Sequence, residues 1–151
     1  MGYVTTSEAD TYVQSHYLVS DQAHVVWSTL DNTSKDVLLT RSFEKLERLA
    51  FTGYKALPDQ LNQFPRYGQL AVPQAIKTAQ IIEALHLSGA FPGYESQQDM
   101  RIRGVKSYTI GKLSETFINP GSGIHGNPSD AMCAEAMSLL LPYMSGGYRV
   151  C

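Results

Sequence analysis

Residues 74–87 limit how this chain can fold more than any other segment, because their apolar side chains do not keep to one side of a helix. Pro73 precedes the segment, at a position where a helix accepts proline. On a helical wheel only Lys77, Gln80 and Glu83 stand out as isolated polar positions; the apolar ones are Ile76, Ala79, Ile81, Ile82, Ala84, Leu85 and Leu87. Such a helix is buried on most of its sides. Either the chain packs around it, or another subunit covers it.

A second segment of this kind follows Pro128 and covers residues 129–144. Its apolar side chains also point almost everywhere; they are Ala131, Met132, Ala136, Met137, Leu139, Leu140, Leu141 and Tyr143. A chain of 151 residues buries only about 70% of its extended surface on folding. Two helices without a polar side therefore favour a mixture of central packing and contact between subunits, and we expect the protein to self-associate.

The remaining segments carry ordinary start and stop signals. Thr5 and Glu8 form a capping box, in which each side chain satisfies a backbone amide of the first helical turn. Another short helix is expected around Trp27, and Gly53 stops the longer helix that follows. The expected helices cover residues 6–16, 23–30, 33 or 34 to 51, 74–87 and 129–144.

Residues 105–110 and 113–118 alternate in the manner of two strands joined by a tight turn at Gly111 and Lys112. Together these patterns predict a mainly α fold: a bundle of about four to five helices with one β-hairpin and an extended C-terminal tail, residues 145–151. The length favours a single domain over residues 1–151.

The net charge of −2 excludes a protein that holds nucleic acid by bulk positive charge. The charge is uneven, however, because acids dominate residues 1–36 and a basic segment precedes and enters the hairpin. The basic residues are Arg101, Arg103, Lys106 and Lys112. Such a run is compatible with a solvated hairpin. Together with Tyr108 it also suits sequence-independent contact with single-stranded DNA, which combines cations with base stacking.

The sequence offers no arrangement for catalysis, for a cofactor or for a metal. Residues 121–126 match G-x-G-x-x-G, but they follow an antiparallel hairpin rather than the parallel strand that a dinucleotide site needs. The four histidines are scattered, and Cys133 and Cys151 are expected to be free thiols in a reducing compartment. No segment is apolar and long enough to span a membrane, and the N-terminus does not look like a signal peptide. We expect a non-enzyme.

The order of several short motifs resembles a known family. These motifs are residues 3–12 (YVTTSEADTY), 39–51 (LTRSFEKLERLAF), 64–66 (FPR), 72–80 (VPQAIKTAQ) and 105–113 (VKSYTIGKL). They are similar to the small head–tail connector, or adaptor, proteins of tailed bacteriophages, some of whose relatives are labelled DnaT-like single-stranded-DNA-binding proteins.

The resemblance implies a structural virion protein that forms a ring, usually of twelve copies, beneath the portal, joins the capsid to the tail and leaves a channel for DNA. The implied partners are other copies of the chain, the portal protein, a further neck or tail-completion protein and, transiently and without sequence preference, genomic DNA, but no membrane. The implied location is the virion neck, after assembly in the host cytoplasm. A different class of protein, a replication accessory protein that binds single-stranded DNA, is the alternative.

Two groups of residues are the candidate sites under this interpretation. The tail is a candidate for docking into the portal or, equally, a frayed terminus; its residues are Gly146, Gly147, Tyr148, Arg149, Val150 and Cys151. The basic segment either faces DNA in the channel or meets acidic residues of a neighbouring subunit; its residues are Arg101, Arg103, Lys106 and Lys112.

Overall fold

The structure, a computed structural model, describes residues 2–92, 107–110, 113–116 and 132–144. The chain divides into two units. The first combines residues 1–90 with 132–151, and the second covers residues 91–131. Each unit is described by itself below, and the expected single domain stays a prediction.

The described part of the chain is mainly helical, with five α-helices and one β-hairpin, which confirms the predicted fold class. The helices of the first unit are α1 (Thr6–His16), α2 (Gln22–Thr29), α3 (Asn32–Glu47), α4 (Gln74–Leu87) and α6 (Ala134–Leu140), which continues into a 3-10 turn, η2 (Leu141–Tyr143). In the second unit, β1 (Ser107–Ile110) pairs antiparallel with β2 (Leu113–Thr116), and Tyr108 lies opposite Glu115.

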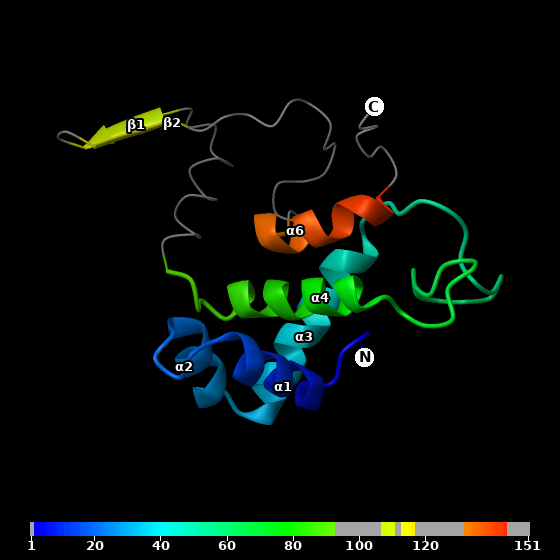
Figure 1. The fold of residues 1–151 in the computed structure, drawn as a ribbon, viewed down its shortest axis with the longest axis horizontal. Helices are drawn as coiled ribbons and strands as arrows, with labels where there is room; N and C mark the ends of the chain where they lie inside the picture. The colour runs from blue at the N-terminus through cyan, green and yellow to red at the C-terminus, as the bar shows by residue number, and fades with distance from the viewer. Residues whose placement is uncertain (1, 93–106, 111–112, 117–131, 145–151) are drawn as a thin grey trace. The chain divides into compact units, whose positions relative to one another are not determined.

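Helix α4 lies at the centre of the first unit, as the distribution of its apolar residues predicts. In Figure 1, α6 lies on one side of α4, α1 and α2 lie on the other, and α3 crosses α4. The helix is buried continuously from Ala79 to Leu85, and its Ile76 is fully buried as well. The chain therefore covers α4 by itself, and this removes the physical reason for expecting another subunit to cover it.

Two of the three polar residues of α4 are buried, and each has hydrogen-bond partners that the helical wheel does not reveal. Gln80 is fully buried, and both ends of its amide are used. Its Oε1 accepts a hydrogen bond from the backbone N of Tyr3 at 3.0 Å, and its Nε2 donates to the backbone O of Leu39 at 2.9 Å. This side chain thus joins the N-terminal segment, α3 and α4.

Glu83 is the second buried polar residue of α4, with 2% of its surface exposed. Its Oε1 accepts from Nζ of Lys45 at 2.6 Å, and its Oε2 accepts from the backbone N of Cys133 at 2.7 Å. A buried carboxylate needs such partners, because an uncompensated charge in the interior is costly. The carboxylate holds α3, α4 and the start of α6 together.

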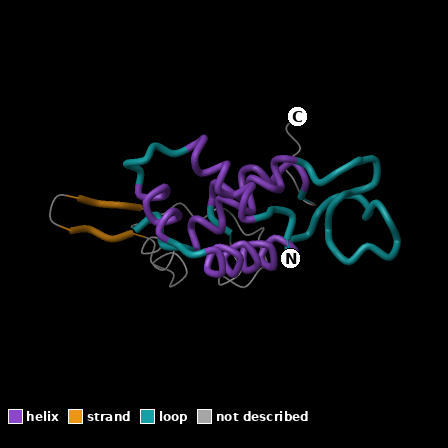
Figure 2. Tube along the Cα trace, turned by 90° about the horizontal axis from the view of Figure 1, so that it is seen from below, coloured by secondary structure: helices purple, strands orange, loops and turns teal. Residues whose placement is uncertain are grey.

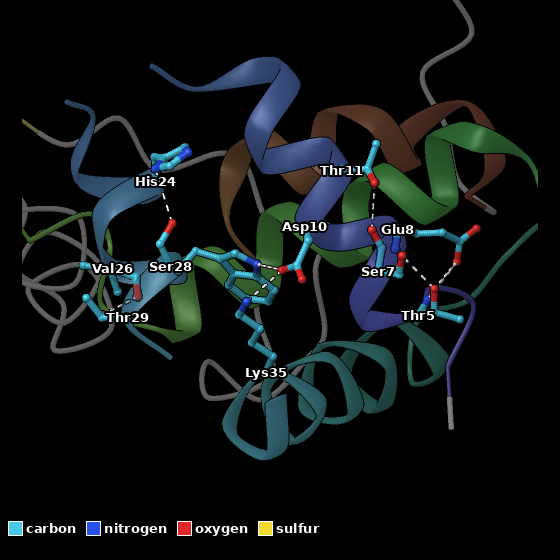
Figure 3. A network of polar contacts seen from close by, with 11 residues as sticks. Thr5, Ser7, Glu8, Asp10, Thr11, His24, Val26, Ser28, Thr29 and Lys35 are labelled. Atoms are coloured by element: carbon cyan, nitrogen blue, oxygen red, sulfur yellow. Dashed lines mark hydrogen bonds and ion pairs between the residues drawn. The ribbon is translucent and has the colours of Figure 1, made fainter. Parts of the chain in front are cut away.

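Asp10 connects α1 with α2 and α3 (Figure 3). Its Oδ1 accepts from Nε1 of Trp27 at 2.7 Å and from Nζ of Lys35 at 2.9 Å. Figure 3 also shows the predicted capping box, in which Thr5 N donates to Glu8 Oε2 at 2.8 Å and Glu8 N donates to Thr5 Oγ1 at 3.2 Å.

Several helix boundaries differ from those expected, among them the end of α3 and the start of α6. Helix α3 ends at Glu47 and not at residue 51. Phe51 is buried outside the helix, where it forms an isolated antiparallel bridge with Met144. Helix α6 begins at residue 134 and not at 129, because Cys133 acts as its N-cap, with Sγ accepting from the backbone N of Ala136 at 3.4 Å. A long-range contact thus holds Phe51 outside α3, whereas a local cap marks the start of α6.

Candidate functional site

The loop between α3 and α4, residues 51–72, carries the most exposed group of large apolar and aromatic side chains in the described part of the chain. Tyr54 is 85% exposed and Tyr67 is 82% exposed. Leu57, Leu61 and Leu70 are exposed as well. The loop stands out to one side of the helices of its unit in both Figure 1 and Figure 2. Exposed apolar surface of this kind, gathered on one element, marks an interaction surface more often than single exposed side chains do.

The backbone of the loop brings the two exposed tyrosines together. Lys55 and Arg66 form an isolated antiparallel bridge, and the backbone N of Tyr67 donates to the backbone O of Tyr54 at 2.8 Å. This hydrogen bond places Tyr54 and Tyr67 beside each other at the bridge, although they are 13 residues apart in the sequence.

Two glycines flank this tyrosine pair, one before Tyr54 and one after Tyr67. Gly53 has a φ of +78° and Gly68 has a φ of +84°, a region that glycine enters without steric cost. A Cβ added at either position would meet nothing within 4 Å. The backbone therefore turns at both glycines, and the space beside each glycine is open apart from its neighbours in the chain.

Arg66 fixes the base of the loop. Its guanidinium carbon lies 5.6 Å from the ring centroid of Phe51 and 5.5 Å from that of Phe64, so the cation interacts with both aromatic faces. Its Nη1 donates to the backbone O of Gly53 at 3.0 Å, and its Nη2 donates to Oε1 of Gln63 at 2.7 Å. Arg66 is buried, and it joins the segment before Tyr54 to the segment before Tyr67.

The same loop is attached to α3 through Glu47 and Tyr3. Both carboxylate oxygens of Glu47 accept from the backbone N of Gln63, at 3.2 and 2.9 Å, and Oε1 also accepts a short hydrogen bond from the hydroxyl of Tyr3. That hydroxyl in turn accepts from the backbone N of Phe64 at 2.9 Å. Burial, and then the hydrogen bond to Glu47, raise the pKa of Tyr3 above its usual range, so the phenol stays protonated.

A third attachment joins the loop to the end of α6. The backbone N of Thr52 donates to the backbone O of Tyr143 at 2.8 Å, and Phe51 pairs with Met144. The ring of Phe64 packs edge to face against Phe51 at 4.8 Å and against Tyr143 at 6.0 Å between centroids. Three separate attachments therefore hold the loop that presents the tyrosine pair.

The loop carries little net charge. Its charged residues are Lys55, Asp59 and Arg66, and the two cations are engaged inside the loop. Nζ of Lys55 donates to the backbone O atoms of Gln60 and Leu61, each at 3.0 Å. This surface is thus suited to contacts with flat or apolar groups more than to neutralising a row of phosphates.

A groove of about 370 Å³ lies between α1 and α4. Hydroxyl groups of Ser7, Thr11 and Ser15 line it, and Lys77 is its cation. Nζ of Lys77 lies 2.8 Å from Oε1 of Glu8, and this ion pair holds the pKa of the Glu8 carboxyl below its ordinary value. Because the acid neutralises the cation, the groove has no net attraction for a phosphate.

All the site residues expected from the sequence lie outside the described residues. This holds for the basic segment, Arg101, Arg103, Lys106 and Lys112, and for the tail, Gly146, Gly147, Tyr148, Arg149, Val150 and Cys151. The structure describes the backbone of the two strands on either side of residues 111–112. The loop at residues 121–126 is also outside the described part.

The tyrosine pair is a feature that sequence reasoning missed. The available signal was the mirrored arrangement of Gly53-Tyr54 and Tyr67-Gly68 at the two ends of a loop rich in proline and leucine. The reading of residues 54–71 as a connecting loop was correct, but periodicity does not distinguish an exposed aromatic in a loop from one that folds back onto the core.

Within the described residues, no three His, Cys, Asp or Glu side chains are grouped so that they could hold a metal ion. Cys133 is a buried free thiol, and burial raises its pKa to about 12, which keeps it protonated. None of the helices in the described ranges is long and apolar enough to cross a membrane.

The fold and the loop together define a mainly helical protein that presents a fixed aromatic surface to solvent. The chain matches, over residues 2–151, the family described as "Putative DnaT-like ssDNA binding protein", and it belongs to that family. No curated protein and no solved structure matches it significantly.

This family membership corrects the interpretation as a head–tail connector. The description of the matched family names single-stranded DNA and contains no connector, portal, virion or ring assembly. The short motifs on which the connector reading depended are individually weak, and they do not separate connectors from relatives labelled as DNA-binding. The expected contact with DNA agrees with the family description, whereas the expected twelve-copy ring, the portal and the neck partner have no support.

Proposed function

We propose that this protein binds single-stranded DNA as a replication accessory protein and catalyses no reaction of its own. The observation that carries the proposal is the family match, which covers residues 2–151 and therefore the helices, the loop and the basic segment together. Assembly in the host cytoplasm stays a prediction from the sequence.

The distribution of charge supports a local contact with DNA. With a net charge of −2, the protein as a whole does not attract a polyanion, so binding depends on separate surfaces of suitable chemistry. Proteins that hold single strands without sequence preference combine a basic track for the phosphates with aromatic side chains for the bases. The chain contains both kinds of residue, in the basic segment and in the loop at residues 51–72.

The basic segment is the proposed source of phosphate contacts. For a single strand, the logarithm of the binding constant falls with the logarithm of salt concentration by about 0.7 for each neutralised phosphate. Replacement of Arg101, Arg103, Lys106 and Lys112 by Gln should therefore lower this slope by up to roughly 3. The same variant tests the competing reading of the segment as an ordinary solvated hairpin, which predicts an unchanged slope.

A fluorescence anisotropy titration with a labelled oligonucleotide at physiological salt tests the proposal directly. We expect sub-micromolar affinity for a single strand and clearly weaker binding to a duplex of the same length and sequence. The purified full-length chain is used, with an unlabelled single strand as competitor to exclude binding to the dye. Absence of binding, or equal affinity for single strand and duplex, would contradict the proposed function.

A further inference from the structure

The tyrosine pair has the properties of a site for flat ligands. Among the tyrosines that the structure describes, Tyr54 and Tyr67 are the exposed ones, at 85% and 82%. Tyr3, in contrast, is buried and serves the core through its ring and hydroxyl. Two neighbouring aromatic side chains that bury almost none of their surface contribute little to the stability of the fold, so their placement needs another explanation.

We infer that Tyr54 and Tyr67 form a stacking site for unpaired DNA bases, selective for bases over phosphates and tolerant of base identity. The inference rests on the proposed function and assigns part of it to these two rings. Base–aromatic stacking is sequence-tolerant because every base has a π-face. The backbone hydrogen bond from Tyr67 to Tyr54 brings the two exposed tyrosines into one neighbourhood, so one strand can contact both side chains.

The rigidity of the loop supports this assignment. Arg66 fixes the base of the loop, Glu47 holds the backbone of Gln63, and Thr52 is bonded to Tyr143. A site held in place before the ligand arrives loses less conformational entropy on binding. Both tyrosines are held by this anchored loop and are more than 80% exposed, so a ligand can reach them without displacing other parts of the chain.

The low charge of the loop separates this site from the basic segment. Lys55 and Arg66 donate to groups of the loop itself, and Asp59 offsets one of them. Contacts made by the tyrosines should therefore depend on the presence of bases and only weakly on salt. Contacts made by the basic segment should depend on phosphates and strongly on salt.

Titrations with two oligonucleotides, one normal and one in which all bases are removed, test the inference. We expect the unsubstituted protein to prefer the normal strand. Tyr54→Ala and Tyr67→Ala should each weaken binding to the normal strand by about 5- to 150-fold, the range for loss of one stacked base. Both should leave the affinity for the abasic strand and the salt slope unchanged. Tyr54→Phe and Tyr67→Phe, which keep the ring, should bind as the unsubstituted protein does.

Matched controls come from the same loop. Leu61→Ala removes another exposed apolar side chain, one without a ring, and it should change the affinity less than twofold. Tyr67→Leu keeps apolar surface without a π-face, and it should behave as Tyr67→Ala. Circular dichroism melting checks that each variant is folded, which we expect because the substituted side chains are exposed.

The outcomes separate the two proposals. If the unsubstituted protein binds neither oligonucleotide, both the proposed function and the stacking site are wrong. If it binds DNA and the two alanine variants bind equally well, the stacking site is wrong and the proposed function stands. If Leu61→Ala weakens binding as much as Tyr67→Ala, or Tyr67→Leu binds normally, the loop contacts DNA through general apolar surface and not through ring stacking, and the stacking site is again refuted.

Discussion

The buried ion pair between Lys45 and Glu83 offers the sharpest test of how the first unit is held together. The Glu83 side chain is 2% exposed and the Lys45 side chain 19% exposed, and the carboxylate also accepts from the backbone N of Cys133. Lys45→Met removes the charge partner and leaves the carboxylate buried. Loss of one member of a buried pair costs about 3–5 kcal/mol, and we expect the lower end of that range because the bond from Cys133 remains.

Substitution of the other member of the pair, Glu83, should cost less. Glu83→Gln keeps a side-chain oxygen for the backbone N of Cys133, and the Lys45 side chain, 19% exposed, is near enough to the surface for water to reach its ammonium group. We expect about 1–3 kcal/mol, the cost of an imperfectly satisfied buried polar group. In the double variant the unpaired charge is absent, so its destabilisation should be smaller than the sum of the single values by about 0.5–3 kcal/mol.

Urea denaturation followed by circular dichroism measures these free energies of unfolding. The dependence of the free energy on urea should be the same in all four proteins, so that the comparison reports native-state stability. Additivity of the two single substitutions within about 0.5 kcal/mol would refute the reasoning, because it would mean that the pair is not coupled.

Three further predictions concern other parts of the first unit. Tyr3→Phe should lower the free energy of unfolding by about 1–3 kcal/mol near neutral pH, because the backbone N of Phe64 loses its buried acceptor. Since the folded-state pKa of Tyr3 is raised, its contribution is fully present below pH ~10 and is lost as pH rises further; alkaline urea titrations should show this loss in the parent and a smaller one in Tyr3→Phe. Gly53→Ala and Gly68→Ala should each cost about 1–2 kcal/mol from backbone strain alone, measured by urea denaturation, and a neutral or stabilising effect would contradict the positive φ angles. Cys133, whose pKa is raised to about 12 by burial, should react with iodoacetamide far more slowly in the native protein than in urea when tested in a Cys151→Ser background, and equal rates would show that the thiol is exposed.

The sequence predicted the helices best where local signals and tertiary packing agree. Helix α4 follows Pro73 and was expected over residues 74–87, which are its observed bounds. The capping box at Thr5 likewise marked the start of α1 correctly. In both cases the neighbouring residues contain the information, so no knowledge of distant contacts was needed.

The sequence did not predict those features of the fold that depend on residues far away in the chain. The contacts of Gln80 and Glu83 were not predicted, because their partners, among them Tyr3 and Cys133, are far away in the sequence. Phe51 continued a helical pattern, but its pairing with Met144 takes it out of α3. The exposure of Tyr54 depends on how the loop is anchored, which no local pattern encodes.

The anchoring of the loop at residues 51–72 also determines how it can be studied. Its supports come from Tyr3, Glu47 and Tyr143, which lie outside the loop in three separate segments of the chain. A synthetic peptide of the loop, or a graft of it onto a foreign scaffold, would lack all three supports and lose the arrangement of its rings. The two tyrosines are therefore a property of the assembled unit and should be investigated by substitution in the intact chain.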